Sequence, residues 1–367
     1  MRIGLNLLYL LPGIVGGTET YAAGLLDGLA QIDKQNEYFV FVNREAAEWP
    51  LPEASNFKRI VCPVNAVSRA KRYFYEQARL SVLLKEYGVV LVHSLGYVAP
   101  FFPPCPSVVT VPDLNYCVFG GRMPPIRRMA LGFFVKWSAR RADHVITISN
   151  FARGQIHLML GIPAAQITVT HLAASAISAD DTDLAAVMRK YGIKQPYIIA
   201  FSSSSPHKNI PCLVRAFAQA RQDYNLPHKL VLLGHRPRHE ASAPGTEDVV
   251  STGYLDESSK NTLLKGAEMM VFPSTYEGFG LPVLEAQQAG VPVICSTAAS
   301  LPEVAGDAAI YFDPLSVAEM SKAIGQAAQT PDLRQTLKQK GFQNAGKFSW
   351  ERTARQTLQV YKTRVKP

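Results

Sequence analysis

The chain has 367 residues, of which 47% are hydrophobic and 18% are charged, and its formal net charge is +9. This composition is typical of a globular protein with two domains of ordinary size, and it excludes an intrinsically disordered chain. The five cysteines are scattered without a Cys-x-x-Cys pair, which favours free thiols in a reducing compartment over a zinc site. The positive charge predicts an anionic partner: nucleic acid, a membrane surface or a phosphorylated substrate.

The first predicted unit is a strand over 2–8, a glycine-rich loop over 13–18 and a helix over 19–32. Asn6 interrupts the apolar run, so this segment is read as a strand rather than a signal peptide. No stretch reaches the roughly 18 apolar residues of a spanning helix. Gly16 and Gly17 would let a phosphate approach the helix start, and an ordinary tight turn remains equally open.

Strand-like runs follow at 38–42, 59–62, 89–93, 107–111, 144–148 and 167–170. Helical patterns between several of them predict a doubly wound parallel sheet. Ligands of such sheets collect at the carboxyl ends of strands, where His93 and Asp113 fall. Asp113 is therefore a site candidate, whereas a structural role is the favoured interpretation of His93.

Two segments combine basic and aromatic residues, at 69–75 and 122–141. An amphipathic helix of this composition fits an anionic membrane interface. An ordinary surface helix with its apolar stripe against the core is the alternative, and both stay open.

Small and acidic residues over 173–183 indicate a linker. Within it, Asp181-Thr182-Asp183 matches a D-x-D metal motif, but its position favours a solvated helix start, so no metal site is predicted. The second domain then begins with a strand over 197–201. The loop that follows has small residues and Lys208 before a helix, which is typical of a phosphate site with a mobile cation.

The most informative stretch is 269–306. A strand ending at Phe272 precedes a glycine-rich loop, and Pro282 places the start of the next helix at about Leu281. Free amides there predict an anion site. Glu277 and Glu285 flank this site; because carboxylates repel phosphate, they are expected to accept hydrogen bonds from hydroxyls of a sugar or ribose. The implied ligand is a sugar nucleotide.

Further strands are predicted at 229–233, 249–253 and 309–312, and helices at 316–328, 332–347 and 350–362, the last capped by Ser349. Glu277, seven residues and then Glu285, with Gly-Phe-Gly-Leu-Pro between them, resembles the E-x7-E signature of the family-four retaining glycosyltransferases. The resemblance implies an α/β fold of two doubly wound Rossmann-like domains facing across a cleft, the GT-B architecture. It implies an acceptor-binding domain over 1–176, completed by a helix over 350–367, and a nucleotide-sugar-binding domain over 177–349.

The resemblance also implies roles for individual residues. Glu277, Lys208 and Asp113 are the expected catalytic residues. The donor-binding residues would be Gly16, Gly17, Ser203, His207, Lys208, Gly278, Phe279, Gly280, Leu281 and Glu285. Two positions depart from the family pattern: Pro112 stands where relatives often have a histidine near the reacting sugar, and Ser203 stands where many have an arginine. Pro112 puts a catalytic role at that position in doubt, and Ser203 removes part of the expected positive charge.

The function implied is transfer of a hexosyl residue, such as mannosyl, glucosyl or rhamnosyl, from a nucleoside-diphosphate sugar to a hydroxyl group, with retention of configuration. The acceptor would be a glycan or a lipid-diphosphate-linked glycan of the cell envelope or an exopolysaccharide. The enzyme would need no metal cofactor and would be cytoplasmic, at the inner face of the plasma membrane. Alternatives are a nucleotide-sugar epimerase or phosphorylase of the same fold. A basic glycan- or nucleic-acid-binding protein would leave Glu277 and Glu285 unexplained, and no nucleic-acid recognition module is seen.

Overall fold

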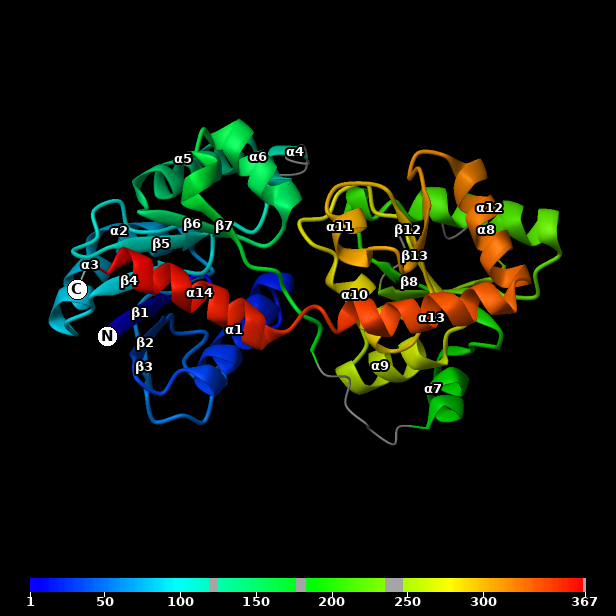
Figure 1. Cartoon of the computed structure of the whole chain (residues 1–367), viewed down its shortest axis with the longest axis horizontal. Coiled ribbons are helices and arrows are strands. Elements are labelled where there is room, and N and C mark those ends of the chain that lie inside the picture. The colour runs from blue at the N-terminus through cyan, green and yellow to red at the C-terminus, as the bar shows by residue number, and fades with distance from the viewer. Residues whose placement is uncertain (119–123, 176–182, 235–246, 366–367) are drawn as a thin grey trace. The chain divides into compact units, whose positions relative to one another are not determined.

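The computed structural model describes residues 1–118, 124–175, 183–234 and 247–365 (Figure 1). The chain divides into two compact units: unit 1 comprises Met1–Ala173 and Ser349–Pro367, and unit 2 comprises Ala174–Phe348. The predicted domain boundary between residues 176 and 177 lies outside the described residues. None of the described helices is long and apolar enough to cross a membrane.

Unit 1 contains a seven-stranded sheet in the order β3-β2-β1-β4-β5-β6-β7, and all neighbouring strands are parallel. The strands are short and mostly apolar, as expected where helices cover both faces of a sheet. The sheet confirms the predicted doubly wound topology, and its strand order reverses between β1 and β4. The strands are β1 (Arg2–Asn6), β2 (Glu37–Val42), β3 (Phe57–Val61), β4 (Leu91–Ser94), β5 (Ser107–Thr110), β6 (His144–Thr147) and β7 (Ile167–Val169).

The helices of unit 1 include one from the C-terminal part of the chain. Figure 1 shows this helix, α14, in red beside α1 in blue, and the two are packed together. Gly24 and Gly28 of α1 make room for Trp350, because a Cβ on either glycine would overlap that residue. The helices are α1 (Gly17–Ile32), α2 (Arg69–Ala78), α3 (Leu80–Glu86), α4 (Asn115–Val118), α5 (Pro125–Arg141), α6 (Asn150–Leu160) and α14 (Trp350–Arg364).

Unit 2 contains a six-stranded parallel sheet in the order β10-β9-β8-β11-β12-β13. Its strand order reverses between β8 and β11, so it repeats the topology of unit 1 on a smaller scale. Both sheets therefore confirm the Rossmann-like prediction. The strands are β8 (Tyr197–Ser202), β9 (Lys229–Gly234), β10 (Val249–Ser251), β11 (Met269–Phe272), β12 (Val293–Ser296) and β13 (Ala309–Phe312).

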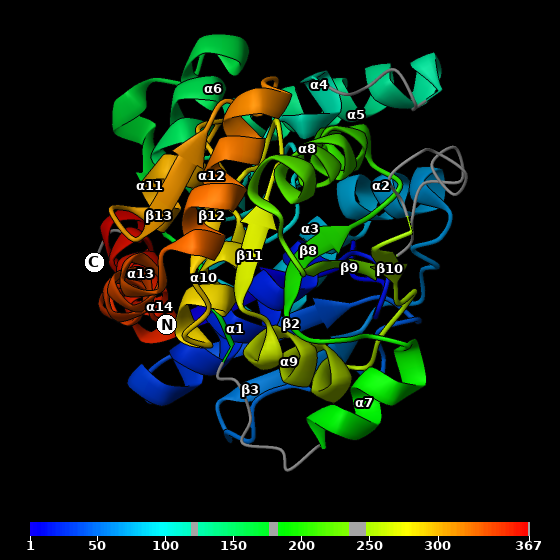
Figure 2. The same ribbon diagram turned by 90° about the vertical axis from the view of Figure 1, so that its right-hand side faces the viewer.

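Two pairs of helices cover the sheet of unit 2. Figure 2 shows α8 and α12 together, and their apolar residues join those of the strands in one core. On the opposite face α10 packs against α13 (Figure 1). The helices of the unit are α7 (Leu184–Tyr191), α8 (Ile210–Tyr224), α9 (Glu257–Gly266), α10 (Leu281–Gln288), α11 (Leu301–Ala305), α12 (Val317–Gln329) and α13 (Pro331–Ala345).

Candidate functional site

Two loops of unit 2 begin where the strand order of its sheet reverses. β8 ends at Ser202 and β11 ends at Phe272, and these two strands are hydrogen-bonded neighbours. Ligands of doubly wound sheets bind outside the carboxyl ends of strands at such a reversal. The loop after β8 carries Lys208 and the loop after β11 carries Glu277, so the topology brings two predicted catalytic residues to one edge.

Lys208 and Glu277 form an ion pair. The Lys208 ammonium donates a hydrogen bond to Glu277 Oε1 at 2.8 Å, and the two side chains are 19% and 15% exposed. The ammonium also lies 5.0 Å from the ring centroid of Phe272. Partial burial strengthens the attraction between the two charges. The prediction made Glu277 an acceptor for sugar hydroxyls, and the structure adds that one of its oxygens already accepts from Lys208.

The backbone around this pair is fixed by buried polar contacts. Ser300 is fully buried, and its Oγ lies 2.9 Å from the carbonyl oxygen of Glu277 and 2.7 Å from that of Phe279. The amide of Thr275 donates to the carbonyl oxygen of His207 at 2.8 Å, which ties the two loops together. A loop held at several points keeps Glu277 in one place relative to Lys208.

Helix α10 begins at Leu281, as predicted, with Pro282 in its first turn. The preceding Gly280 has a φ of 109°, a conformation that strongly favours glycine, and a Cβ there would lie 2.7 Å from Leu301 Cδ2. The first amides of a helix have no acceptor within the helix. The glycine-rich turn therefore delivers the chain into a helix start that can receive an anion.

The predicted donor-binding residues of this turn differ in their side chains. Phe279 is 3% exposed, and its ring packs against Phe348 with a centroid distance of 5.9 Å. Its side chain is thus part of the core of unit 2, and only its backbone could face a ligand. Gly278 and Gly280 likewise offer backbone groups alone, and Leu281 is half-buried.

Glu285 lies one turn into α10 and has a basic neighbour that the sequence did not indicate. Lys260 of α9 places its ammonium 3.5 Å from Glu285 Oε2, and it also pairs with Glu257. Burial raises the pKa of Glu285, and the charge of Lys260 opposes that rise. Burial lowers the pKa of Lys260, but the charges of Glu285 and Glu257 outweigh it, so this pKa is raised. Lys260 was missed because its partner lies on a different helix.

Ser203 and His207 occupy the loop after β8. The Ser203 hydroxyl accepts a hydrogen bond from the amide of Ser205 at 3.2 Å, which shapes the loop. Burial lowers the pKa of His207, the charge of Glu277 opposes this, and that of Lys208 adds to it. A neutral imidazole cannot supply the charge of the arginine that Ser203 replaces. Lys208 is therefore the charged cation of this loop.

The glycine-rich loop of unit 1 is open to a ligand, but one of its backbone amides already has a hydrogen-bond acceptor. A Cβ on Gly16 or Gly17 would meet no atom within 4 Å, so ligand atoms could approach there. Gly16 has a φ of 56°, which accounts for a glycine at this position. Glu19 already accepts a hydrogen bond from the amide of Gly13 at 2.8 Å and one from the Trp49 indole at 3.1 Å. An acid in the first turn of α1 reduces the attraction of this loop for a phosphate.

Asp113 and His93 lie at strand ends of unit 1 in different surroundings. Asp113 is half-buried, and its Oδ1 accepts hydrogen bonds from the Tyr97 hydroxyl at 2.9 Å and from the amide of Asn115 at 3.2 Å. His93 is fully buried, with its ring nitrogens 2.6 and 2.8 Å from the hydroxyls of Tyr361 and Thr110. Burial lowers the pKa of His93 to about 3. These contacts agree with a structural role for His93.

Only Asp183 of the D-x-D motif lies among the residues that the structure describes. Asp181 and Thr182 lie outside the described residues, and Asp183 caps α7 by accepting from the amide of Ala185 at 2.9 Å. Within 1–118, 124–175, 183–234 and 247–365, no three His, Cys, Asp or Glu side chains converge as metal ligands would.

Two family models match consecutive parts of the chain. The model described as Glycosyltransferase Family 4 matches residues 15–174, and the model described as Glycosyl transferases group 1 matches residues 185–344. The two matches correspond to the greater part of unit 1 and of unit 2.

Curated relatives match over part of their length. The chain is 35% identical over 231 residues to O-antigen chain mannosyltransferase B of Escherichia coli, covering 60% of this chain and 61% of that protein. It is 31% identical over 255 residues to the MMP alpha-(1->4)-mannosyltransferase of Mycolicibacterium hassiacum, covering 66% and 60%. The matched region thus spans about three fifths of the length of these relatives.

Solved structures match over nearly the whole chain. A sucrose-phosphate synthase from Thermosynechococcus elongatus has a TM-score of 0.76 at 20% identity, with 99% of this chain and 98% of that chain covered. HepE from Anabaena, in complex with UDP and glucose, has a TM-score of 0.72 at 17% identity, with 99% and 100% covered. At these identities the likeness shows the fold.

Proposed function

Because the chain belongs to glycosyltransferase family 4, we propose that it transfers a hexosyl residue from a nucleoside-diphosphate sugar to a hydroxyl group of a cell-envelope glycan. Its fold is the GT-B architecture of two Rossmann-like domains. The two relatives described above are named as mannosyltransferases, so we propose mannose as the first donor sugar to test. Retention of anomeric configuration is part of the proposal.

The observation that carries this proposal is the Lys208–Glu277 pair at the reversal of the sheet in unit 2. An ammonium has three donors, and the contact with Glu277 uses one of them. The remaining donors, with the amides at the start of α10, supply positive partners for a diphosphate. Glu285, with Lys260 beside it, is the proposed acceptor for the ribose hydroxyls.

The proposed mechanism needs charge stabilisation and positioning. The acceptor oxygen bonds to the anomeric carbon while the bond from that carbon to the diphosphate oxygen breaks. The leaving diphosphate takes the acceptor proton on the same face of the sugar, so no side chain need act as a covalent nucleophile. Lys208 meets the negative charge that develops on the leaving group, and Glu277 orients the sugar hydroxyls. We propose that these groups do this without a metal.

The test is a panel of nucleotide sugars, GDP-mannose, UDP-glucose and dTDP-rhamnose, with and without a lipid-linked glycan acceptor. Acceptor-dependent release of the nucleotide from one donor is expected, and NMR of the product should show the anomeric configuration of the donor. Inverted configuration would refute the mechanism. Acceptor-independent epimerisation or phosphorolysis would refute the transferase assignment.

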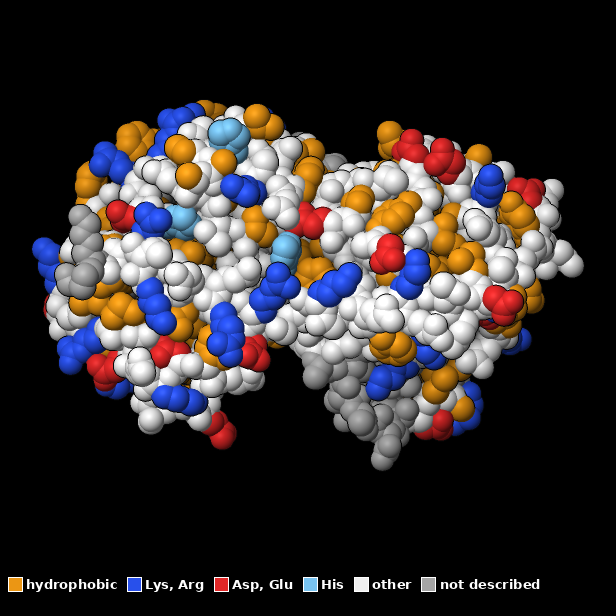
Figure 3. Space-filling model, viewed as in Figure 1, with side chains coloured by type: hydrophobic (Ala, Val, Ile, Leu, Met, Phe, Trp, Pro, Cys, Tyr) orange, Lys and Arg blue, Asp and Glu red, His pale blue; other side chains and the backbone are white. Residues whose placement is uncertain are grey.

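We also propose that unit 1 contacts an anionic membrane surface at the inner face of the plasma membrane. The outward side of α5 is apolar: Ile126, Met129, Phe133 and Trp137 are 84%, 73%, 51% and 41% exposed. Val135, Ser138 and Ala139 form its buried side, so the apolar stripe does not face the core. Figure 3 shows Lys and Arg side chains among hydrophobic ones over this part of unit 1. Arg122 lies outside the described residues.

Exposed cations accompany this stripe, and each would contribute about 1 kcal/mol near an anionic leaflet. Arg127, Arg128 and Lys136 are exposed on α5 itself. The expected result is co-sedimentation with phosphatidylglycerol vesicles at low salt, weakened by salt. The double variant Ile126→Ser/Met129→Ser should lose it. The control is Leu158→Ser on α6, equally exposed at 77%. Equal binding by both variants would refute the membrane proposal.

A further inference from the structure

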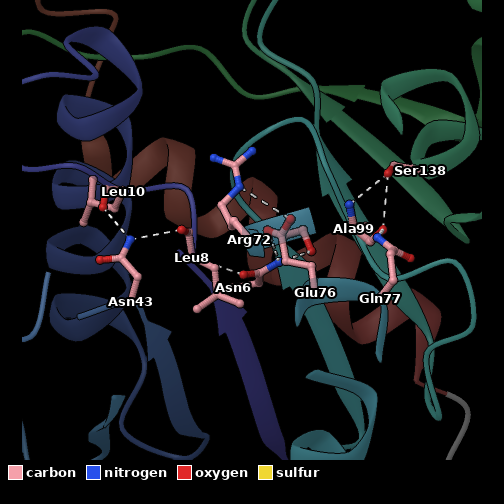
Figure 4. Close-up of polar contacts among 10 residues, drawn as sticks. Asn6, Leu8, Leu10, Asn43, Arg72, Glu76, Gln77, Ala99 and Ser138 are labelled. Atoms are coloured by element: carbon pink, nitrogen blue, oxygen red, sulfur yellow. Dashed lines mark hydrogen bonds and ion pairs between the residues drawn. The ribbon is translucent and has the colours of Figure 1, made fainter. Parts of the chain in front are cut away.

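The buried side of α2 carries an ion pair at the carboxyl edge of the sheet in unit 1. Figure 4 shows Arg72 and Glu76 beside Asn6 at the end of β1. The Asn6 amide donates to Glu76 Oε1 at 3.4 Å and to the hydroxyl of Ser94, at the end of β4, at 3.1 Å. β1 and β4 are the strands between which the order reverses. This is the position in unit 1 that corresponds to the Lys208–Glu277 position in unit 2.

Glu76 lies behind Arg72 and orients its guanidinium. Arg72 Nε lies 3.7 Å from Glu76 Oε2, and the two residues are 8% and 1% exposed. The guanidinium carbon also lies 4.6 Å from the ring centroid of Tyr73. The contact with Glu76 is an ion pair without a hydrogen bond, since Arg72 Nε and Glu76 Oε2 both lack a hydrogen-bond partner. Burial, this ion pair and the Tyr73 ring together restrict the rotamers of Arg72. It is therefore preorganised for a planar, bidentate contact.

The two terminal nitrogens of Arg72 point away from Glu76 in Figure 4. Within the described part of the chain they have no ion-pair or hydrogen-bond partner. The buried Nε of Arg72 also lacks a hydrogen-bond partner, and a buried polar atom without a partner needs a physical reason. The terminal N–H groups of Arg72 are thus restricted in position and have no acceptor among the described residues. They could donate to an anionic group of a ligand.

More positive charge lies close to Arg72. Burial and the charges of Arg127 and Arg72 lower the pKa of Arg69, so these three arginines from α2 and α5 are near enough to repel one another. Neither Arg69 nor Arg127 forms an ion pair with any carboxylate that the structure describes. Glu76 is thus the one carboxylate shown to pair with the three, so an excess of positive charge remains whether Glu76 is ionised or protonated. A group with two negative charges, such as a diphosphate, would balance it.

The cluster is also connected to the apolar stripe of α5. Tyr73, which follows Arg72, packs against Phe134 of α5 with a centroid distance of 4.4 Å. Phe134 in turn lies next to Phe133 of the exposed stripe, with a centroid distance of 5.6 Å. A ligand that joins a diphosphate to a hydrocarbon chain would therefore find its two kinds of partner on neighbouring residues.

We propose that Arg72, positioned by Glu76 and assisted by Arg69 and Arg127, binds the diphosphate of a lipid-linked acceptor. This inference rests on the proposed function, and it names the substrate class and the residues of unit 1 that recognise it. Arg72 is the binding residue, and Glu76 is a positioning residue that acts through it.

The test is the Kd of the full-length protein for farnesyl diphosphate, measured by calorimetry at about 0.15 M salt, where long-range attraction is largely screened. Inorganic pyrophosphate tests the contribution of the diphosphate alone, and farnesol tests that of the hydrocarbon chain alone. Arg72→Gln should raise the Kd for farnesyl diphosphate by about tenfold or more, since a bidentate charged contact is lost. Arg72→Lys should recover little, because a point charge replaces the fork. The control is Arg79→Gln, at the exposed C-terminal end of α2, which should change the Kd less than twofold.

Glu76→Gln should also raise the Kd for farnesyl diphosphate. The double variant Glu76→Gln/Arg72→Gln should bind it no more weakly than Arg72→Gln alone. In turnover, Glu76→Gln should raise the acceptor KM while leaving kcat near that of the wild type. If the losses of binding free energy in the two single variants add up in the double variant, Glu76 does not act through Arg72 and its positioning role is refuted.

Several results would overturn the proposal. An equal loss of affinity for farnesyl diphosphate in Arg72→Gln and Arg79→Gln would indicate non-specific attraction. Farnesol binding as tight as that of farnesyl diphosphate would show that the diphosphate is not recognised. Pyrophosphate binding as tight as farnesyl diphosphate would refute the lipid-linked source. Should Arg72→Gln fail to fold, the exposed pair Arg69→Gln/Arg127→Gln provides the same test, and an unchanged Kd there would refute it. Nucleotide binding and sugar transfer are measured alongside. If transfer occurs but Arg72→Gln leaves the Kd for farnesyl diphosphate unchanged, the diphosphate subsite is refuted and the proposed function stands. If binding of farnesyl diphosphate depends on Arg72 but no donor supports transfer, the proposed function is refuted.

Discussion

Replacing Glu76 by glutamine should change how the stability of unit 1 depends on pH. Burial raises the pKa of the Glu76 carboxyl from its ordinary 4.5 to about 7, and the charge of Arg72 and the Asn6 hydrogen bond oppose this. The folded state therefore holds the proton more tightly than the unfolded state. The stabilising contribution is fully present below about pH 4.5 and is lost as the pH rises through about 7. This difference in pKa between the unfolded and folded states corresponds to about 3 kcal/mol of stability.

Most of this change, about 2.5 kcal/mol, falls between about pH 5 and pH 8. Glutamine does not titrate, so the free energy of unfolding of wild type minus that of Glu76→Gln should fall by this amount across the range. The three tryptophans, Trp49, Trp137 and Trp350, all belong to unit 1, so their fluorescence during urea unfolding reports on this unit. Other titrating groups, such as His93 and His144, cancel in the difference. A constant difference across the range would show that Arg72 keeps Glu76 ionised, and the reasoning would be wrong.

Three further predictions concern other parts of the molecule. Lys208→Ala should lower kcat by roughly 100-fold, because it removes a partner of the leaving diphosphate, whereas Glu285→Ala should mainly raise the donor KM; wild-type kinetics in both variants would contradict the site. Excess EDTA should leave transfer unchanged, and loss that Mg²⁺ or Mn²⁺ restores would contradict the proposed metal-free mechanism. Gly24→Ala should destabilise unit 1 by about 1–3 kcal/mol, since its Cβ would overlap Trp350, and a shift of the urea midpoint measured by fluorescence checks this.

The strand-loop-helix around Glu277 was predictable because its signals are local. Gly280 and Pro282 restrict the backbone, and the helix starts at Leu281 as these two residues require. The parallel sheets were predictable for a similar reason, since buried strands alternate with helical patterns along the chain. Local signals of this kind do not depend on the rest of the fold.

Contacts between distant segments could not be read in the same way. Lys260 meets Glu285 from another helix, and Glu76 meets Asn6 across 70 residues of chain. The outward direction of the α5 stripe was also undecided, because apolar and basic residues occur on all sides of that helix. Only the packing of Val135 shows which side is buried. Ring contacts and ion pairs of this kind arise from topology, and the spacing of residues along the sequence carries no record of them.

The return of α14 to unit 1 has a consequence for the newly synthesised chain. The ribosome releases 174–348, the whole of unit 2, before it releases α14. Until then the groove of Gly24 on α1 lacks Trp350, and the buried ring of His93 lacks the hydroxyl of Tyr361. Unit 2, made from one continuous stretch, can close its sheet while unit 1 still exposes apolar surface. The part of the protein that is synthesised first is therefore the part that finishes folding last, and chaperones would be needed chiefly during that interval.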